Sequence, residues 1–194
     1  MRKSMVGLLF LGILAGGCGM MKSEAGDSFD KPKPAPELAK LAKFVGNWTG
    51  TAEMISPTAE EMKKMMPEGS KPIPSTLKSA EKWEWVDGGL TLRGEGWHER
   101  PGGEKENWAG VIVWDARSKT YRSWWRSDYG TIMEGRMSIS DDGNMWKVSI
   151  KTLVGEKSSG SGTLTFANDR MMEWDWTEKS SMGKFKLKGT STKQ

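Results

Sequence analysis

The stretch Gly46-Asn47-Trp48-Thr49-Gly50 stands where the pattern of the chain changes from helical to extended. In residues 37–44, just before it, apolar side chains recur at helical spacing, and Gly46 is a typical helix stop. In residues 48–55 apolar and polar side chains alternate as they do in a half-buried strand. The sequence therefore predicts a short helix followed at once by the first strand of a sheet.

Further strand-like segments follow, separated by turn sequences such as Asp87-Gly88-Gly89 and Asp141-Asp142-Gly143-Asn144. A helical segment, 59–66, and a proline-rich loop, 67–74, come after the first strand, and the Gly/Ser-rich run 155–162 is expected to be a loop. Strands spaced by about ten residues indicate a sandwich or a barrel. The strands are expected at residues 48–55, 77–86, 90–98, 106–114, 120–127, 131–140, 145–152, 162–166, 171–177 and 184–190.

Connections this short favour up-and-down pairing, and closure of the sheet removes its two exposed edges. We therefore expect an all-β fold, namely an antiparallel up-and-down β-barrel of about ten strands. A short N-terminal helix precedes the barrel, and one helical insertion follows its first strand.

The N-terminus has the organisation of an export signal. Arg2 and Lys3 precede a short apolar run, 5–14, which is shorter than the roughly 20 residues that a membrane-spanning helix needs. The run Leu14-Ala15-Gly16-Gly17-Cys18 resembles the lipobox of bacterial lipoproteins. This resemblance implies that residues 1–17 are a signal peptide and that Cys18 carries a fatty acid such as palmitate. The alternative is an ordinary secretory signal with an incidental cysteine.

The same resemblance implies a lipid-anchored protein of the bacterial cell envelope. Gly19, which follows the cysteine, resembles the residue found there in lipoproteins directed to the outer membrane. Residues 18–36 are polar and end in alternating prolines, so we expect a disordered tether, with the barrel domain at 37–194. Cys18 is the one cysteine, and the domain therefore has no intramolecular disulfide.

The charge of the chain gives little support to nucleic-acid binding. Removal of Arg2 and Lys3 with the signal peptide lowers the formal net charge from +4 to +2. The basic residues are scattered over strands and turns and form no dense patch, and an envelope location points the same way.

Two features resemble known barrel families. The short helix followed by Gly46, Trp48 and Gly50 resembles the calycin group of lipocalins, fatty-acid-binding proteins and nitrobindin-like barrels. This implies that Trp48 packs across the closed end of the barrel and that the helix plugs that end. The run 114–125, WDARSKTYRSWW, is similar to the central hairpin of an uncharacterised bacterial lipocalin-like family, and that resemblance extends over about residues 38–190.

Tryptophan is unusually frequent, with eleven in the chain, all on expected strands. Alternation places most of them on one face of the sheet, whereas Trp97 and Trp124 fall on the opposite, charged face. Side chains can fill a barrel of this size, or the barrel can hold one ligand. We expect a small apolar or aromatic ligand to contact the inward residues Trp85, Trp108, Ile112, Tyr121, Trp125, Met133, Trp174 and Trp176.

Other functions stay open at this point. A carbohydrate-binding protein would use exposed tryptophans such as Trp97 and Trp124, and a structural envelope protein would have a barrel filled by its own side chains. An enzyme would need a concave cluster of carboxylates, and Glu173 and Asp175 are expected on the solvated exterior. We therefore expect no catalytic residues.

No cofactor or metal is expected either. In nitrobindin-like barrels a histidine binds the haem iron, but the C-terminal strands contain no histidine, and His98 is expected at the rim of the barrel. Ligation by methionine or tyrosine is left open. On the predicted helical insertion Met62, Met65 and Met66 form either an apolar lid for the barrel or a thioether site for copper.

Overall fold

The computed structural model describes residues 32–65, 68–69, 74, 76–100, 103–181 and 183–194. The chain divides into two units, residues 1–32 and 33–194, and the fold described below is that of the second. The predicted signal peptide and Cys18 lie outside the described residues. No helix of the described part is long and apolar enough to cross a membrane.

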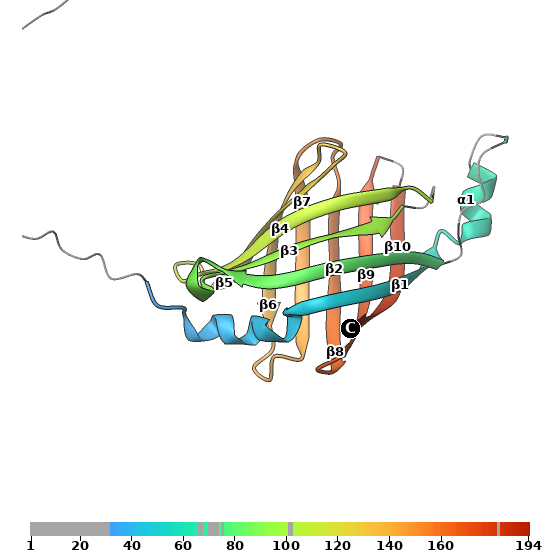
Figure 1. The fold of residues 1–194 in the computed structure, drawn as a ribbon. Helices are drawn as coiled ribbons and strands as arrows, with labels where there is room; N and C mark the ends of the chain where they lie inside the picture. The colour runs from blue at the N-terminus through green and yellow to red at the C-terminus, as the bar shows by residue number, and fades with distance from the viewer. Residues whose placement is uncertain (1–31, 66–67, 70–73, 75, 101–102, 182) are drawn as a thin grey trace, which may run out of the picture. The chain divides into compact units, whose positions relative to one another are not determined.

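The described residues form a closed barrel of antiparallel strands, as expected (Figure 1). Each strand pairs with its neighbours in the chain, and β1 pairs with β10 to close the sheet. The strands are β1 (Gly46–Ser56), β2 (Thr76–Val86), β3 (Thr91–Glu99), β4 (Lys105–Asp115), β5 (Thr120–Ser127), β6 (Ile132–Ile139), β7 (Met145–Val154), β8 (Ser159–Asn168), β9 (Met171–Ser180) and β10 (Gly183–Lys193).

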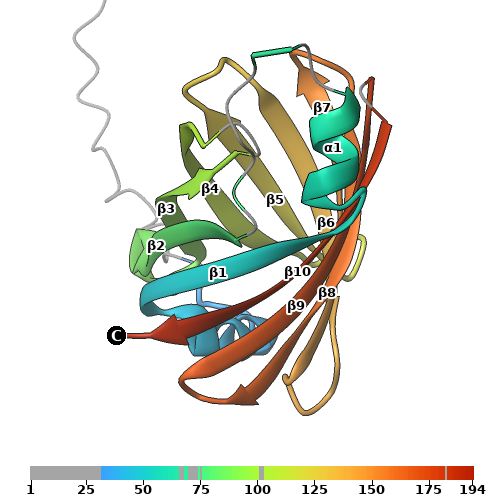
Figure 2. The ribbon, with the colours of Figure 1, turned by 90° about the vertical axis from the view of Figure 1, so that its right-hand side faces the viewer.

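Three short helices accompany the barrel in the described part of the chain. The 3₁₀ helix η1 (Pro36–Phe44) precedes β1, α1 (Ala59–Met65) follows it, and the single turn η2 (Asp87–Gly89) joins β2 to β3. Figure 1 shows η1 and α1 at opposite ends of β1, and Figure 2 shows the barrel turned by 90°. We call the end that η1 occupies the plugged end and the opposite end the far end.

The register of the sheet confirms the predicted faces of the tryptophans. Trp83 pairs with Gly94, which pairs with Gly110, which pairs with Trp125, and directly paired residues lie on the same face. On β1 the buried residues are Trp48 and its alternate neighbours Gly50, Ala52 and Met54, so this face points to the interior of the barrel. Gly46, on the same face of β1, pairs with Trp83, and the tryptophans therefore share the interior face. We call this interior the lumen.

The plug has the geometry that its sequence favours. Leu38, Leu41 and Phe44 are buried and recur at every third residue. Three residues make one turn of a 3₁₀ helix, so this spacing places all three side chains on one face. The Tyr121 hydroxyl donates a hydrogen bond of 2.7 Å to the Glu37 carbonyl at the start of η1. Burial raises the pKa of Tyr121 to about 12, and the hydroxyl therefore keeps its proton over the physiological range.

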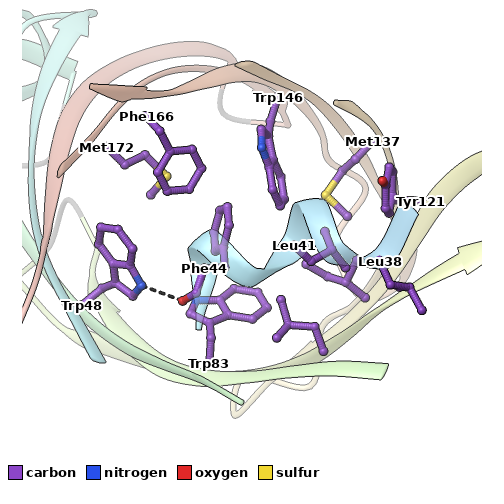
Figure 3. Packing of buried hydrophobic residues seen from close by; sticks show 12 residues of the cluster. Leu38, Leu41, Phe44, Trp48, Trp83, Tyr121, Met137, Trp146, Phe166 and Met172 are labelled. Atoms are coloured by element: carbon purple, nitrogen blue, oxygen red, sulfur yellow. Dashed lines mark hydrogen bonds between the residues drawn. The ribbon is translucent and has the colours of Figure 1, made fainter. Parts of the chain in front are cut away.

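Phe44 is the centre of an aromatic cluster that fills the plugged end (Figure 3). Its ring centroid lies 4.4 Å from that of Trp146 and 5.3 Å from those of Trp83 and Phe166. The tilted and edge-on arrangements of these rings are the favourable ones for aromatic pairs. The barrel is therefore closed at this end by side chains from η1 and from at least three strands.

The last carbonyls of η1 are held by polar groups of the barrel wall. The Trp48 indole N–H donates to the Phe44 carbonyl at 2.7 Å (dashed line in Figure 3), and the Lys193 ammonium donates to the Lys43 carbonyl at 3.0 Å. The Lys193 ammonium also lies 5.0 Å from the ring centroid of Trp48. A cation and an N–H donor thus satisfy the negative end of the helix. This confirms the expected position of Trp48.

One expectation about the chain was wrong. The run 155–162, expected to be a loop, is strand from Ser159 onward, where Gly160 and Gly162 pair with β7 and β9. Glycine is poor in strands, which favoured the loop prediction. The Trp176 ring packs directly over both glycines, where a Cβ at either position would collide with it. The indole thus occupies the place of the missing side chains and stabilises the strand.

The substitution Phe44→Ala is expected to lower the free energy of unfolding by about 3–5 kcal/mol, because it leaves a cavity among rings that cannot collapse. The control is Tyr129→Ala, since Tyr129 is 50% exposed and its loss leaves no such cavity. Urea denaturation of the purified variants, followed by circular dichroism, measures both changes. Equal destabilisation by the two substitutions would contradict the role of Phe44 as the plug.

Candidate functional site

Several inward tryptophans, from Trp83 in the plug cluster to others farther along the barrel, lie flat against its wall. Trp83 pairs across the sheet with Gly94, and Trp125 pairs with Gly110. A Cβ atom at Gly94 would stand 2.6 Å from the Trp83 ring, and one at Gly110 would meet the Trp125 ring and a backbone oxygen. The indoles therefore cover the glycines instead of projecting straight across the lumen.

Trp174 and Trp176 repeat this arrangement on the other side of the barrel. Trp174 covers Gly189 of β10, and Trp176 covers Gly160 and Gly162 of β8. A ring that lies along the wall occupies less of the central space than one that projects across it, and it presents a flat apolar surface to the lumen.

The indoles are fixed by contacts with one another and with serines. The ring centroids of Trp83, Trp108 and Trp125 lie 5.2–5.8 Å apart in tilted and edge-on pairs. The Trp125 indole N–H donates to the Ser123 hydroxyl at 2.9 Å. Trp174 donates to the Ser191 hydroxyl at 3.3 Å. Such contacts hold the lining in place before any ligand arrives.

The exposure of inward residues changes along the barrel axis. Near the plug they are buried, with Trp48 at 1% and Trp146 at 0%. Farther along, many inward residues keep partial exposure, although their strands are paired on both sides. These residues are Trp108, Trp125, Met133, Ile150, Trp174, Trp176 and Glu178. Since they face the lumen, we attribute the exposed surface to it. On β1 and β2, by contrast, Met54 and Leu77 are buried.

All of the residues predicted to bind a ligand face the lumen, but at different depths. Ile112 and Tyr121 are buried in the core of the plugged end, and Trp85 packs against that core. Partly exposed positions farther along belong to Trp108, Trp125, Met133, Trp174 and Trp176. The second group is the part of the predicted set that keeps partial exposure.

Three carboxylates that were not among the predicted site residues also face the lumen. Glu81 on β2, Glu106 on β4 and Glu178 on β9 share the inward face with the tryptophans. Each stands two residues from an inward tryptophan: Glu81 from Trp83, Glu106 from Trp108 and Glu178 from Trp176. Strand alternation was the signal that could have found them, since residues two apart face the same way.

The lumen raises the pKa of two of these carboxyls. Burial raises the pKa of Glu81 from 4.5 to about 7, and the neighbouring Trp83 N–H and His98 offset only part of the rise. Burial also raises the pKa of Glu178, and the charge of Glu106 adds to the rise. Glu106 and Glu178 are therefore within electrostatic range of each other, although they belong to strands on different sides of the barrel.

The pKa of Glu106 is lowered, unlike those of Glu81 and Glu178, because its carboxylate has charged partners. His98 Nε2 lies 3.4 Å and Arg100 Nε lies 3.7 Å from its carboxylate, and the contact with His98 is the main reason why its pKa is lowered. His98 lies at the end of β3, as expected for a rim residue, with 47% of its side chain exposed. It nevertheless faces the lumen and pairs with Glu106 across the sheet.

The outward tryptophans do not form a shared platform. Trp97 pairs with Asn107 and Trp124 pairs with Val111, so the two stand beside β4 at different heights. The Lys105 ammonium lies 3.7 Å from the Trp97 ring centroid, and the Arg122 guanidinium lies 5.2 Å from that of Trp124. The other outward pair, Glu173 and Asp175, is exposed as expected.

The helical insertion begins with a capping box. The Thr58 hydroxyl accepts from the Glu61 N–H at 3.2 Å, and the Glu61 carboxylate accepts from the Thr58 N–H at 2.7 Å. A shallow cavity of about 560 Å³ separates α1 from the start of β10 and is lined by Ser56, Pro57, Glu61, Lys64, Gly183, Lys184 and Phe185. α1 thus lies near the far end, beside β10.

The lid and copper interpretations of the methionines remain predictions. Met62 is partly exposed on α1, and Met66 and the side chain of Met65 lie outside the described residues. Among the residues that the structure describes, no three histidine, cysteine, aspartate or glutamate side chains are grouped so that they could hold a metal ion.

Neither a protein-family model nor a curated protein matches this sequence. Among solved structures, that of Rv2717c from M. tuberculosis is similar, with a TM-score of 0.60 at 12% identity over 84% of this chain and 99% of that one. The S-type phycobiliprotein lyase CPES from Guillardia theta has a TM-score of 0.48 at 11% identity over 81% of this chain and 92% of the lyase. The redesigned barrel mFAP1, bound to DFHBI, has a TM-score of 0.42 at 13% identity over 78% of this chain and 95% of the other. At 12% identity the likeness to Rv2717c concerns the fold alone.

The substitution Glu81→Gln is expected to stabilise the protein in a pH-dependent way. A raised pKa means that the folded state holds the proton more tightly than the unfolded state. The stability that the protonated Glu81 provides is therefore complete below about pH 4.5 and is lost as the pH rises through about 7. A neutral glutamine avoids this loss, so we expect a gain of up to about 3 kcal/mol over wild type at about pH 8.5 and a much smaller one at about pH 5.

Denaturation curves at the two pH values measure this difference. The control is Glu173→Gln, on the exposed outer face, where the gain should stay near zero at both pH values. A gain for Glu81→Gln that is the same at both pH values would contradict the assignment of a buried, titrating carboxyl.

Proposed function

We propose that the protein binds a small molecule with an apolar or aromatic body inside the lumen. The observation that carries this proposal is the set of inward indoles beyond the plug, which lie flat over glycines and keep partial exposure. A barrel that only had to be stable would fill this space with aliphatic side chains at the density of a protein core.

The binding energy comes from transfer of the apolar body out of water and onto the indole faces. The lining is held in place by ring contacts and by hydrogen bonds from Trp125 and Trp174 to serines, so little ordering is needed on binding. Polar groups at the far end orient the ligand. In this proposal the protein binds its ligand without converting it and needs no cofactor.

The two rival functions have less support. A carbohydrate site on the outer face would need neighbouring exposed indoles, whereas Trp97 and Trp124 stand apart and are each covered by a cation. A purely structural barrel would leave the partial exposure of the inward residues and the lumen carboxylates without a role.

We further propose that the protein is a lipoprotein of the bacterial cell envelope, anchored through Cys18 and directed to the outer membrane. The support is the sequence 14–18 after a short apolar run, followed by Gly19 and by the proline-rich residues before the barrel. Such an anchor would keep the binding domain at the membrane surface, where apolar molecules concentrate.

Binding can be measured with the neutral fluorescent probe N-phenyl-1-naphthylamine, whose emission rises in an apolar site. We expect saturable binding by the purified protein, and we expect Trp176→Ala and the lumen-filling variant Ile150→Trp to weaken it at least about tenfold. The control Trp124→Ala changes an indole on the outer face and should leave affinity unchanged. Absence of saturable binding, or an equal loss in the control, would argue against a site in the lumen.

The anchor is tested by growing a bacterial host that expresses the full chain with labelled palmitate. The wild type should carry label and sediment with membranes, whereas Cys18→Ala should lose both the label and the sedimentation, because no other cysteine can accept the lipid. Ser23→Ala, downstream of the lipobox-like run, is the matched control and should retain the label. Labelled Cys18→Ala protein would refute lipidation at this residue.

A further inference from the structure

Exposed apolar side chains gather at the far end of the barrel. Because neighbouring strands are antiparallel, the odd-numbered strands run from the plugged end to the far end. Among the described residues seven large apolar side chains are exposed, and five of them lie at the ends of these strands or in the turn after β5. The five are Ile55, Tyr129, Ile132, Leu153 and Val154. Scattered exposed apolar residues are normal, but their concentration at one end indicates an interaction surface.

Four of the five lie on two adjoining turns, and we call Tyr129, Ile132, Leu153 and Val154 the rim patch. Ile132 pairs with Val154 across β6 and β7. The loop after β7 lies against the turn after β5, since a Cβ at Gly155 would stand 3.3 Å from the Thr131 hydroxyl. Residues 128–130 and 153–157 are all exposed. The rim patch therefore lies on the tips of turns.

A cluster of lysines is the second observation at this end. Lys179 and Lys184 pair directly across β9 and β10, and both are exposed on the outer face. Lys186 follows on the same face of β10, and Lys64 of α1 lines one shallow cavity together with Lys184. None of the four forms an ion pair with any residue that the structure describes. Like charges directly opposite each other in a sheet are unfavourable, and an anion outside the protein would offset this cost.

The lysine cluster and the rim patch are neighbours on the rim. The Ser181 hydroxyl, in the turn between β9 and β10, donates a hydrogen bond to the Glu156 carboxylate in the loop after β7. This bond joins the hairpin that carries Lys179 and Lys184 to the loop that carries the apolar side chains of residues 153 and 154. The far end thus presents apolar tips and unpaired cations together.

An anionic lipid bilayer fits both features. Peripheral proteins bind bilayers by burying apolar side chains roughly 5–10 Å deep at the boundary of headgroups and acyl chains, while lysines meet the anionic headgroups. A protein partner would have to match the shape of the patch closely, whereas a bilayer accepts side chains that stand on separate turn tips. The far end is also the end that the plug leaves unfilled, so an apolar ligand of the lumen would pass through it.

The anchor proposed at Cys18 permits this orientation. At about 3.1 Å per residue, an extended chain over residues 19–35 would span roughly 50 Å. The 11 residues of β1 span roughly 36 Å. A lipid attached ahead of the plugged end can therefore enter the same membrane that the far end contacts.

We propose that the far end of the barrel docks on an anionic lipid bilayer, with the rim patch at the acyl boundary and Lys64, Lys179, Lys184 and Lys186 on the headgroup phosphates. This inference goes beyond the proposed function, because it concerns the outer rim and does not require an occupied lumen. If the lumen binds an apolar molecule, docking places its mouth against the phase from which such a molecule comes.

Position-specific fluorescence measures the insertion. Because Cys18 is the one cysteine, the full-length Cys18→Ala protein accepts a single reporter cysteine, Ile132→Cys or Met145→Cys, labelled with the environment-sensitive dye NBD. Met145 is the matched control, since it is 45% exposed against 40% for Ile132 but lies at the plugged end. Both proteins have the same N-terminus, so any attachment through that segment affects them alike.

The vesicles contain phosphatidylethanolamine and phosphatidylglycerol. The emission of the label at residue 132 should rise on addition of vesicles and should be quenched by a nitroxide on the acyl chains, and the label at residue 145 should show neither change. Absence of the change at residue 132, or equal changes at both positions, would overturn insertion of the rim patch. A rise that needs no vesicles and grows with protein concentration would mean that a second copy covers the patch, and would overturn the bilayer as its partner.

Loss of charge tests the lysine cluster. In the Cys18→Ala background, Lys179→Ser with Lys184→Ser should lower partitioning into these vesicles at least about tenfold and leave partitioning into phosphatidylcholine vesicles unchanged. The control removes two exposed cations of the plugged end, Arg117→Ser with Lys147→Ser. Equal losses in the two double variants would assign the attraction to net charge and overturn docking through the far end. Probe binding to the lumen in vesicle-free solution tests the proposed function separately, and neither result decides the other.

Discussion

The structure depends on how a sheet of ten strands is closed at one end. Barrels of about eight strands can be filled by their own side chains, and a wider barrel leaves space that the strands alone do not fill. Here the 3₁₀ helix η1 enters that space, and Phe44 meets rings from several strands. The hydrogen bond from the Trp48 indole to the Phe44 carbonyl joins the end of the plug to the first strand and fixes the depth at which the plug stops. Beyond that depth, inward indoles that pack over glycines of the neighbouring strands line the barrel.

The two ends of the barrel differ in the residues that face the lumen. The plugged end is aromatic and aliphatic, and it contains the deeply buried residues Leu41, Trp48 and Trp146. Farther along, the glycines of β8 and β10 are covered by the indoles of Trp174 and Trp176, and burial raises the pKa of Glu178. Glycine in a strand and an unpaired carboxylate in a barrel both reduce stability. The buried aromatic core at the plugged end offsets the cost of these features farther along the barrel.

The sequence predicted the architecture because the relevant signals are local. Turn sequences marked the ends of the strands, alternation gave the faces of the tryptophans, and Gly46 and Trp48 marked the boundary between plug and sheet. The strand at Ser159 was missed for a physical reason, since two glycines weaken a strand unless a neighbouring ring covers them. That ring, Trp176, lies on the next strand, and no local pattern reveals which glycine it will cover.

For the candidate site, the sequence predicts which residues face inward but not which of them meet across the barrel. Alternation placed Trp108, Trp125, Trp174 and Trp176 in the lumen, and it would have placed Glu81, Glu106 and Glu178 there as well.

Alternation does not show that carboxylates from β4 and β9 come within electrostatic range of each other, because that depends on the stagger of the strands around the closed barrel. It also does not show which of them obtain partners. His98 and Arg100 follow one another at the end of β3, and the pairing of β3 with β4 brings both to Glu106. Glu81 and Glu178 form no ion pair with any residue that the structure describes, and which inward carboxylate obtains a partner is therefore set by the register of the closed sheet.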